Sequence, residues 1–234
     1  MFFKSEMKSP VAAYIDHTLL KSVSRFTDIE KLCSEAVENH FFAVCIPPHA
    51  IVKAVDCLKG TSVKTATVIG FPMGYSNTDS KKAEVVQAVG DGAEELDVVI
   101  NLMALKNGDW SFLEKEMEPL VSLIHEKGRI IKVIVESGVL NSDELLHCCE
   151  MYGRMGIDFM KTSTGYAEKG ASVSDVQKMR KNLPPEVQIK ASGGIRHYTF
   201  AKDLIEAGAA RLGCSGGLQI LEEEKKALIF EKTV

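Results

Sequence analysis

The chain has 234 residues and a formal net charge of −4 at pH 7, with 45% hydrophobic and 26% charged residues. These proportions are ordinary for a soluble globular protein with enough apolar side chains for a large core. The acidic balance argues against nucleic acid as a partner, and no run reaches the ~18 to 20 apolar residues needed to cross a membrane. Six scattered cysteines without a CxxC pair predict free thiols in a reducing compartment, and hence a cytoplasmic protein.

Strand-like and helical segments alternate along the first half of the chain, after a short tail predicted for residues 1–9. The strands are short apolar runs, typical of strands buried on both faces of a sheet, and the helices show apolar residues at helical spacing. In chain order they are a strand at 12–20, a helix that begins with Thr27 as its cap, a strand at 41–48, a helix at 49–58, a strand at 63–74, a helix at 80–89, a strand at 94–101 and a long helix at about 110–127.

The second half continues the alternation with four more strands. They are expected at 129–138, 158–165, 187–194 and 210–217, and the helices behind them are one capped by Asn141 or Ser142 and three at 174–182, 198–206 and 218–228. Each strand must return to the same edge of the sheet through a crossover helix, so the sheet is predicted to be parallel. Eight units at this length match a closed barrel better than an open sheet of five or six strands. The predicted fold class is α/β, a single-domain TIM (β/α)8 barrel over residues 1–234.

Four lysines lie in the predicted strands, and their positions along the strands distinguish them. Lys64 and Lys132 stand near the starts of their strands, whereas Lys161 and Lys190 stand near the ends, just before small polar residues and glycine. Active sites of TIM barrels lie at the C-terminal ends of the strands. We therefore expect Lys161 and Lys190 to share a site, and Lys132 to have a structural role paired with an acid. A lone lysine at a strand end is more often solvated or salt-bridged, but two with the same surroundings bring the structural and the catalytic interpretations close to even.

A lysine attacks a carbonyl only as the neutral amine, which is rare for a free side chain at neutral pH. Desolvation and a second nearby cation both favour the neutral form, so Lys190 opposite Lys161 predicts a Schiff base on Lys161. Asp97 lies within the apolar strand EELDVVIN, where a carboxylate needs a cation or a donor. We expect Asp97 to manage protons beside the two lysines, and a solvated position at a sheet edge is the alternative.

Glycine-rich turns follow the seventh and eighth strands. Gly193 and Gly194 stand at the end of the seventh strand, and Gly213 and Ser215 stand at the end of the eighth. Barrels commonly bind a phosphate at these two turns, through backbone N–H groups and a helix N-terminus. The two turns together predict a phosphorylated substrate.

Eight motifs occur in a fixed order along the chain: IDHTLLK from Ile15, VCIPP from Val44, VIGFPMG from Val68, ELDVVIN from Glu95, VIVESG from Val133, KTSTGY from Lys161, KASGGIR from Lys190 and ARLGCSGG from Ala210. Together they closely resemble the deoxyribose-phosphate aldolase family over nearly the whole chain. The resemblance implies a Schiff base on Lys161, with Asp97 and Lys190 as proton donors or acceptors. It also implies a substrate site formed by Gly165, Gly193, Gly194, Gly213 and Ser215 around the phosphate, Asp16 and Thr18 near the hydroxyls, and Cys45 near the mouth.

Two departures from the family pattern concern the phosphate rather than the chemical step. Family members often have two serines after the strand-eight glycine, where this chain has Cys214, Ser215 and Gly216, which implies one phosphate hydroxyl fewer. Tyr166 replaces the lysine that some members carry after the TSTG turn, which removes one cation.

The implied reaction is the reversible, cofactor-free cleavage of 2-deoxy-D-ribose 5-phosphate into D-glyceraldehyde 3-phosphate and acetaldehyde, in deoxyribose phosphate catabolism. The resemblance also implies a homodimer or a higher homo-oligomer. No metal site is expected, because His17 is the only histidine at a strand end and no partner set accompanies it. Two alternatives stay open: another barrel enzyme acting on sugar phosphates, such as an epimerase or a metal-dependent aldolase, and a barrel that binds sugar phosphates without chemistry.

Overall fold

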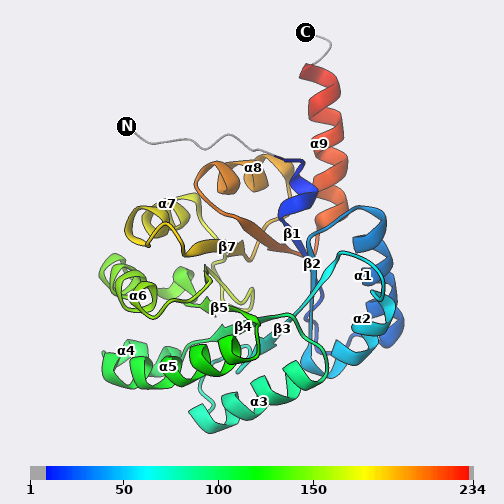
Figure 1. The fold of residues 1–234 in the computed structure, drawn as a ribbon. Helices are drawn as coiled ribbons and strands as arrows, with labels where there is room; N and C mark the ends of the chain where they lie inside the picture. Colours follow the sequence, from blue (N-terminus) through cyan, green and yellow to red (C-terminus); the bar gives the residue numbers. More distant parts are fainter. Residues whose placement is uncertain (1–8, 232–234) are drawn as a thin grey trace.

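The computed structural model describes residues 9–231, so the tail predicted for residues 1–9 falls almost entirely outside the described residues. Eight parallel strands close into a barrel in which each strand pairs with the next along the chain and β8 pairs with β1 (Figure 1). The strands are β1 (Ile15–Thr18), β2 (Ala43–Ile46), β3 (Lys64–Ile69), β4 (Glu95–Val99), β5 (Ile130–Ile134), β6 (Phe159–Lys161), β7 (Gln188–Ser192) and β8 (Arg211–Cys214). The predicted TIM barrel is confirmed.

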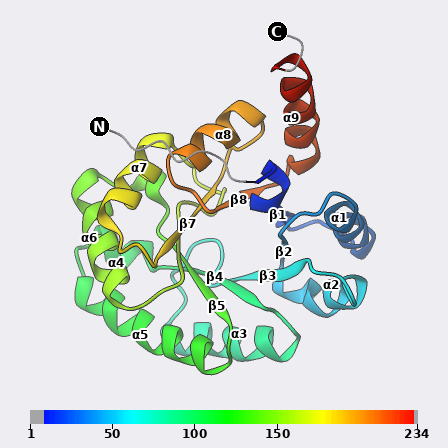
Figure 2. The same cartoon turned by 45° about the horizontal axis from the view of Figure 1, so that its top comes forward.

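Helices follow the strands and surround the barrel, as the turned view shows (Figure 2). They are α1 (Phe26–Glu38), α2 (Ile51–Cys57), α3 (Thr78–Gly90), α4 (Leu102–Lys106), α5 (Trp110–Glu126), α6 (Ser142–Arg154), α7 (Val173–Asn182), α8 (Tyr198–Glu206) and α9 (Gly217–Glu231). The described part of the chain also contains short 3₁₀ helices at Val11–Tyr14, Pro48–Ala50 and Ser137–Val139. Within residues 9–231 no helix is both long and apolar enough to cross a membrane.

The start of α1 and the presence of α4 differ from the sequence-based expectation. The predicted cap Thr27 lies inside the first turn, because the helix begins at Phe26 with Arg25 as its N-cap and the Asp28 carboxylate accepts the Arg25 N–H at 2.8 Å. The short helix α4 begins where the side chain of Asn101 accepts the N–H of Ala104 at 3.0 Å. At the start of α6, Asn141 rather than Ser142 is the cap.

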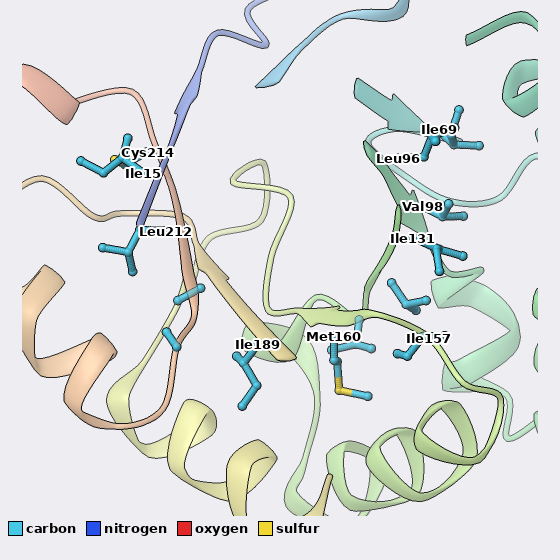
Figure 3. Packing of buried hydrophobic residues seen from close by; sticks show 14 of the residues in the cluster. Ile15, Ile69, Leu96, Val98, Ile131, Ile157, Met160, Ile189, Leu212 and Cys214 are labelled. Carbon is cyan, nitrogen blue, oxygen red and sulfur yellow. The ribbon is translucent and has the colours of Figure 1, made fainter. Parts of the chain in front are cut away.

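Outward-facing side chains of the strands pack against the surrounding helices. Figure 3 shows Ile15, Val98, Met160, Ile189 and Leu212, from five different strands, pointing away from the barrel interior. All five are 0% exposed. Removing such side chains from water, at roughly 25 cal/mol per Å² of apolar surface, favours a closed layer of helices and leaves little freedom at the strand ends.

Inward-facing side chains divide the barrel interior into two sectors. One is apolar and small: Cys45, Ala66 and Val68 of β2 and β3 pack with Leu20 and Phe71. The other sector is charged and buried, and its members are Asp16, Glu95, Asp97, Lys132, Lys161, Lys190 and Arg211. Barrel interiors are usually filled by branched apolar side chains. A charged sector is costly to bury, so it marks the region where function is expected.

Candidate active site

The Asp97 carboxylate on β4 is the common acceptor for three buried lysines. Its Oδ1 accepts from Lys132 Nζ at 2.8 Å, and its Oδ2 accepts from Lys161 Nζ at 2.7 Å and from Lys190 Nζ at 2.8 Å. Asp97, Lys132 and Lys190 are 0% exposed, and Lys161 is 2% exposed. The alternative of a solvated edge position for Asp97 is therefore wrong. The acid partner predicted for Lys132 is confirmed.

Strand register brings these side chains to one place. Asp97 on β4 is aligned with Lys132 on β5, and Lys161 on β6 is aligned with Lys190 on β7. Lys161 is also aligned with Ile134, two residues beyond Lys132 on β5. Since alternate residues of a strand share a face, Lys132 and Lys161 both point inward, with Lys161 one layer nearer the C-terminal mouth.

Arg211, at the start of β8, joins two further acids to the lysine cluster. Its Nη1 donates to Asp16 Oδ1 at 2.7 Å, and its Nη2 donates to Glu95 Oε1 at 3.0 Å. The other oxygens of these acids contact the lysines: Asp16 Oδ2 lies 2.5 Å from Lys190 Nζ, and Glu95 Oε2 lies 2.7 Å from Lys132 Nζ. Every buried carboxylate of the barrel interior therefore has cations at both oxygens.

These contacts fix the charge states on which chemistry depends. Burial alone would raise the pKa of Asp97, but Lys132, Lys161 and Lys190 hold it well below its usual range. Burial likewise disfavours the ammonium form of Lys190, yet Asp16 and Asp97 keep the pKa of Lys190 well above its usual range. At neutral pH Asp97 is therefore an ionised carboxylate and Lys190 is an ammonium.

A cavity of about 410 Å³ opens at the C-terminal ends of the strands. Among the described residues, Lys161 is the one member of the charged cluster that lines it. The other predicted site residues found in its wall are Thr18, Gly165, Gly193, Gly194, Gly213 and Ser215. A substrate in this cavity would meet Lys161 before any other amine of the cluster.

Four predicted site residues do not line the cavity. Asp97, Lys190, Asp16 and Cys45 are all 0% exposed. Cys45 Sγ lies 3.9 Å from Asp97 Oδ2, and burial raises the pKa of its thiol. A proton can therefore pass between these groups and a substrate in the cavity only through an intervening group.

The wall of the cavity favours an anion. It includes Lys21 and Arg196 as well as Lys161, and none of the described aspartates or glutamates lines it. Helix α9 begins at Gly217, two residues beyond Ser215, so its electropositive N-terminus lies next to the cavity.

The loop after β6 is held in place by contacts that the sequence did not indicate. The buried carboxylate of Glu136 accepts the backbone N–H of Thr164 at 3.2 Å and also the Thr164 hydroxyl. At the far end of this loop, the Tyr166 hydroxyl donates to the carbonyl of Leu20 at 2.7 Å, and its ring meets Phe71 edge to face. The turn that carries Gly165 is therefore tied to two sides of the mouth.

Sequence reasoning missed four side chains that the structure adds to the site. Lys21 and Arg196 close the motifs IDHTLLK and KASGGIR, so their positions in the loops after β1 and β7 were available as a signal. Glu95 and Arg211 stand at the starts of their strands, where only the alternation of inward and outward residues indicates that they face the interior.

Comparisons with known proteins agree with this geometry. The sequence profile described as DeoC/LacD family aldolase matches residues 10–223. A protein of Thermococcus gammatolerans named deoxyribose-phosphate aldolase is 47% identical over 219 residues, which cover 93% of this chain and 97% of that protein. A protein of the same name from Caldanaerobacter subterraneus is 44% identical over 227 residues, covering 97% of this chain and 98% of that protein.

A solved structure shares both fold and sequence with the chain. It is described as a unique tetrameric structure of deoxyribose phosphate aldolase from Aeropyrum pernix, and it is 31% identical. The superposition has a TM-score of 0.87 and covers 95% of this chain and 94% of that chain.

Replacing Asp97 by Asn should destabilise the protein by roughly 3–5 kcal/mol at neutral pH, because three buried lysines lose their shared anion. The pKa of Asp97 is depressed in the folded state, so its contribution is present above the unfolded value near ~4 and is lost as the pH falls through the folded value. Urea unfolding should therefore show a difference in the free energy of unfolding between the wild type and Asp97→Asn that is constant near neutral pH and becomes smaller in acid.

Asp79→Asn is the matched control for this loss of charge. Asp79 is 93% exposed and pairs only weakly with Lys82, at 3.4 Å, so its replacement should cost less than about 1 kcal/mol. Equal stability of Asp97→Asn and the wild type at neutral pH would contradict the role given to this carboxylate.

Proposed function

Because this chain belongs to the DeoC/LacD family of aldolases, a family of carbon–carbon lyases, we propose that it is a class I deoxyribose-phosphate aldolase. It would cleave 2-deoxy-D-ribose 5-phosphate reversibly into D-glyceraldehyde 3-phosphate and acetaldehyde. The observation that carries the proposal is the position of Lys161, which lines the cavity while its Nζ shares the Asp97 Oδ2 atom with Lys190.

The first half of the reaction forms an imine on Lys161. Its neutral amine attacks the C1 aldehyde of the open-chain sugar, and the carbinolamine loses water to give a protonated imine. The water leaves with a proton donated from the cluster, and Lys190 is the ammonium placed to supply it. Asp97 Oδ2 contacts both amines, so one oxygen atom can pass a proton between them.

The second half breaks the C2–C3 bond. Removal of the C3 hydroxyl proton turns C3 into the aldehyde of glyceraldehyde 3-phosphate, and the electrons of the C2–C3 bond move into the imine to give an enamine. Asp97, ionised beside its lysines, is the base for this proton, with Lys190 and a water molecule as the relay. Protonation of the enamine at C2 and hydrolysis of the imine then release acetaldehyde and restore the Lys161 amine.

The alternatives differ from this proposal in what they require of Lys161. An epimerase or a metal-dependent aldolase needs no Schiff base, and a barrel that only binds sugar phosphates needs no amine beside a proton relay. Within residues 9–231 no group of three histidine, cysteine, aspartate or glutamate side chains is arranged to hold a metal ion. His17 pairs with Glu35 at 2.8 Å and packs against Phe41.

The Schiff base can be tested by trapping it. Wild-type protein incubated with acetaldehyde and borohydride should gain one ethyl group by intact mass, because reduction turns the imine into a stable secondary amine. Lys161→Leu should gain none. Lys64→Leu, which removes a strand lysine paired with Glu94 at 2.7 Å, should still form the adduct. Equal labelling of the wild type and Lys161→Leu would remove Lys161 from this role.

Lys21 and Arg196 are proposed to bind the substrate phosphate. Tyr166 stands where some members of the family have a lysine, and its phenol carries no positive charge and is bonded to Leu20. The positive charge that balances the phosphate must therefore come from other residues in the wall of the cavity. Neither Lys21 nor Arg196 forms an ion pair with another residue in the range 9–231, and both line the cavity. Their charges therefore remain available to an anion.

Arg196→Gln should raise KM for 2-deoxy-D-ribose 5-phosphate about tenfold or more with little change in kcat, because a charge-assisted hydrogen bond to phosphate is worth roughly 1.5–3 kcal/mol. Cleavage of unphosphorylated 2-deoxy-D-ribose should be unaffected. Lys59→Gln, an exposed change in the turn after α2, is the control. An equal loss with both sugars would contradict a phosphate contact.

The chain is proposed to form a homo-oligomer. The relative from Aeropyrum pernix is described as tetrameric, and here α1 and α2 carry the apolar side chains of Phe26 and Val52 with 52% and 53% of their surfaces exposed. Sedimentation velocity should give a mass at least twice that of one chain. A single-chain mass at all micromolar concentrations would contradict the proposal.

A further inference from the structure

Six of the seven charged side chains inside the barrel form a closed ring of ion pairs, and the seventh is an additional cation. Around the ring the charges alternate in sign: Asp97, Lys132, Glu95, Arg211, Asp16 and Lys190, which returns to Asp97. Each neighbouring pair is joined by a nitrogen-to-oxygen distance of 3.0 Å or less. The additional cation is Lys161, whose ion pair within the described residues is with Asp97 at 2.7 Å.

The charges of this cluster balance in only one state of Lys161. The three acids and three cations of the ring cancel, so the sum is +1 when Lys161 is an ammonium and zero when Lys161 is an amine. A net charge is costly in a buried site because few solvent dipoles stabilise it. Within these seven side chains, a change of one charge in the ring therefore changes the electrostatic cost of an ammonium at Lys161.

Arg211 lies at the N-terminal ends of the strands, which we call the floor of the barrel. It is shielded from water there, so its electrostatic interactions with the other buried charges are weakly screened. The guanidinium carbon of Arg211 lies 3.2 Å from the centre of the Phe42 ring and 5.5 Å from that of Phe159. Arg211 itself is 6% exposed. Charges shielded from water are screened weakly by salt, so a change at the floor is felt at the mouth.

Other ionisable groups around Lys161 come from several elements. They are Asp16 on β1, Cys45 on β2, Asp97 on β4, Lys132 on β5, Glu136 after β5 and Lys190 on β7, with Lys21 and Arg196 in the wall of the cavity. Burial raises the pKa of both Cys45 and Glu136. Glu136 is bonded to Thr164 and not to a member of the ring, and its carboxylate also interacts electrostatically with Lys161. Changes at Glu95 and Arg211 leave this interaction in place in every variant.

We propose that Arg211 and Glu95 are positioning residues that set, from the floor of the barrel, how readily Lys161 takes the neutral form that attacks an aldehyde. Neither lines the cavity, so neither touches the substrate. Arg211 acts through Asp16 and Lys190, and Glu95 acts through Lys132 and Asp97. The inference rests on the Schiff-base function proposed for Lys161.

Removing the two charges separately should move the pH dependence in opposite directions. Arg211→Met leaves the ring at −1 and favours the Lys161 ammonium, so the acidic limb of kcat/KM for 2-deoxy-D-ribose 5-phosphate should move to higher pH. Glu95→Gln leaves the ring at +1, and the limb should move to lower pH. Each shift should be on the order of one pH unit, a tenfold change in rate at fixed pH on that limb. The double variant restores the balance and should return towards the wild-type midpoint.

The chain offers a matched control for the disruption of a buried ion pair. Lys81 on α3 and Glu116 on α5 are paired at 2.8 Å and both are 0% exposed, but they lie outside the barrel interior. Lys81→Met and Glu116→Gln make the same changes of charge and also destabilise the fold. Neither should move the midpoint of the pH profile.

The outcomes separate this inference from the function on which it rests. A wild type that forms no borohydride-trapped adduct with acetaldehyde refutes the proposed function itself. If the wild type forms the adduct, three results for the midpoint of the acidic limb refute the positioning role. The midpoints of Arg211→Met and Glu95→Gln could shift in the same direction, they could stay at the wild-type value, or the Lys81 and Glu116 controls could shift equally. Should Arg211→Met not fold, the nearly isosteric Glu95→Gln carries the test alone, and a midpoint that does not fall refutes the role.

Discussion

One carboxylate, that of Asp97, makes it possible to bury three lysines in the interior of this barrel. An isolated ammonium in such a place would lose its proton or destabilise the fold. Three ammonium groups around a single anion would still leave an excess of positive charge. The chain meets this constraint with Asp16 and Glu95, and Arg211 then joins these two acids. The charges therefore stabilise one another as a set, and Lys161 is the described member of that set that lines the cavity.

Stability and function are divided between the two faces of the same strands. The outward side chains, such as Ile189 and Leu212, form an ordinary apolar core with the helices. On the inward face, charged side chains occupy positions that are filled by apolar side chains in most barrels. Rigid neighbouring strands hold Lys161 and Lys190 in register, which is the precision that proton transfer over a few tenths of an ångström requires. Loops supply the part of the site that only has to hold an anion.

Much of this arrangement could be predicted from the sequence, because apolar runs, helix spacing and strand ends are local signals. The eight alternations predicted the barrel, and the positions of Lys161 and Lys190 at strand ends indicated where a site would be. Pairing at the strand starts could not be seen in the same way. Arg211 and Glu95 are 116 residues apart along the chain, and only closure of the barrel brings them together. The cap of α1 was misplaced because Arg25 has none of the usual capping side chains.

The contact between Phe42 and Arg211 at the floor has a consequence for the access of solvent to the barrel interior. Phe42 and Arg211 close one end of the interior, and the cavity at the other end is where the sugar would sit. A sugar bound there would lie between the buried charged side chains and bulk water. Protons exchanged with the sugar would then have to pass through the amines and carboxylates of the interior, where Asp97 Oδ2 contacts both Lys161 and Lys190.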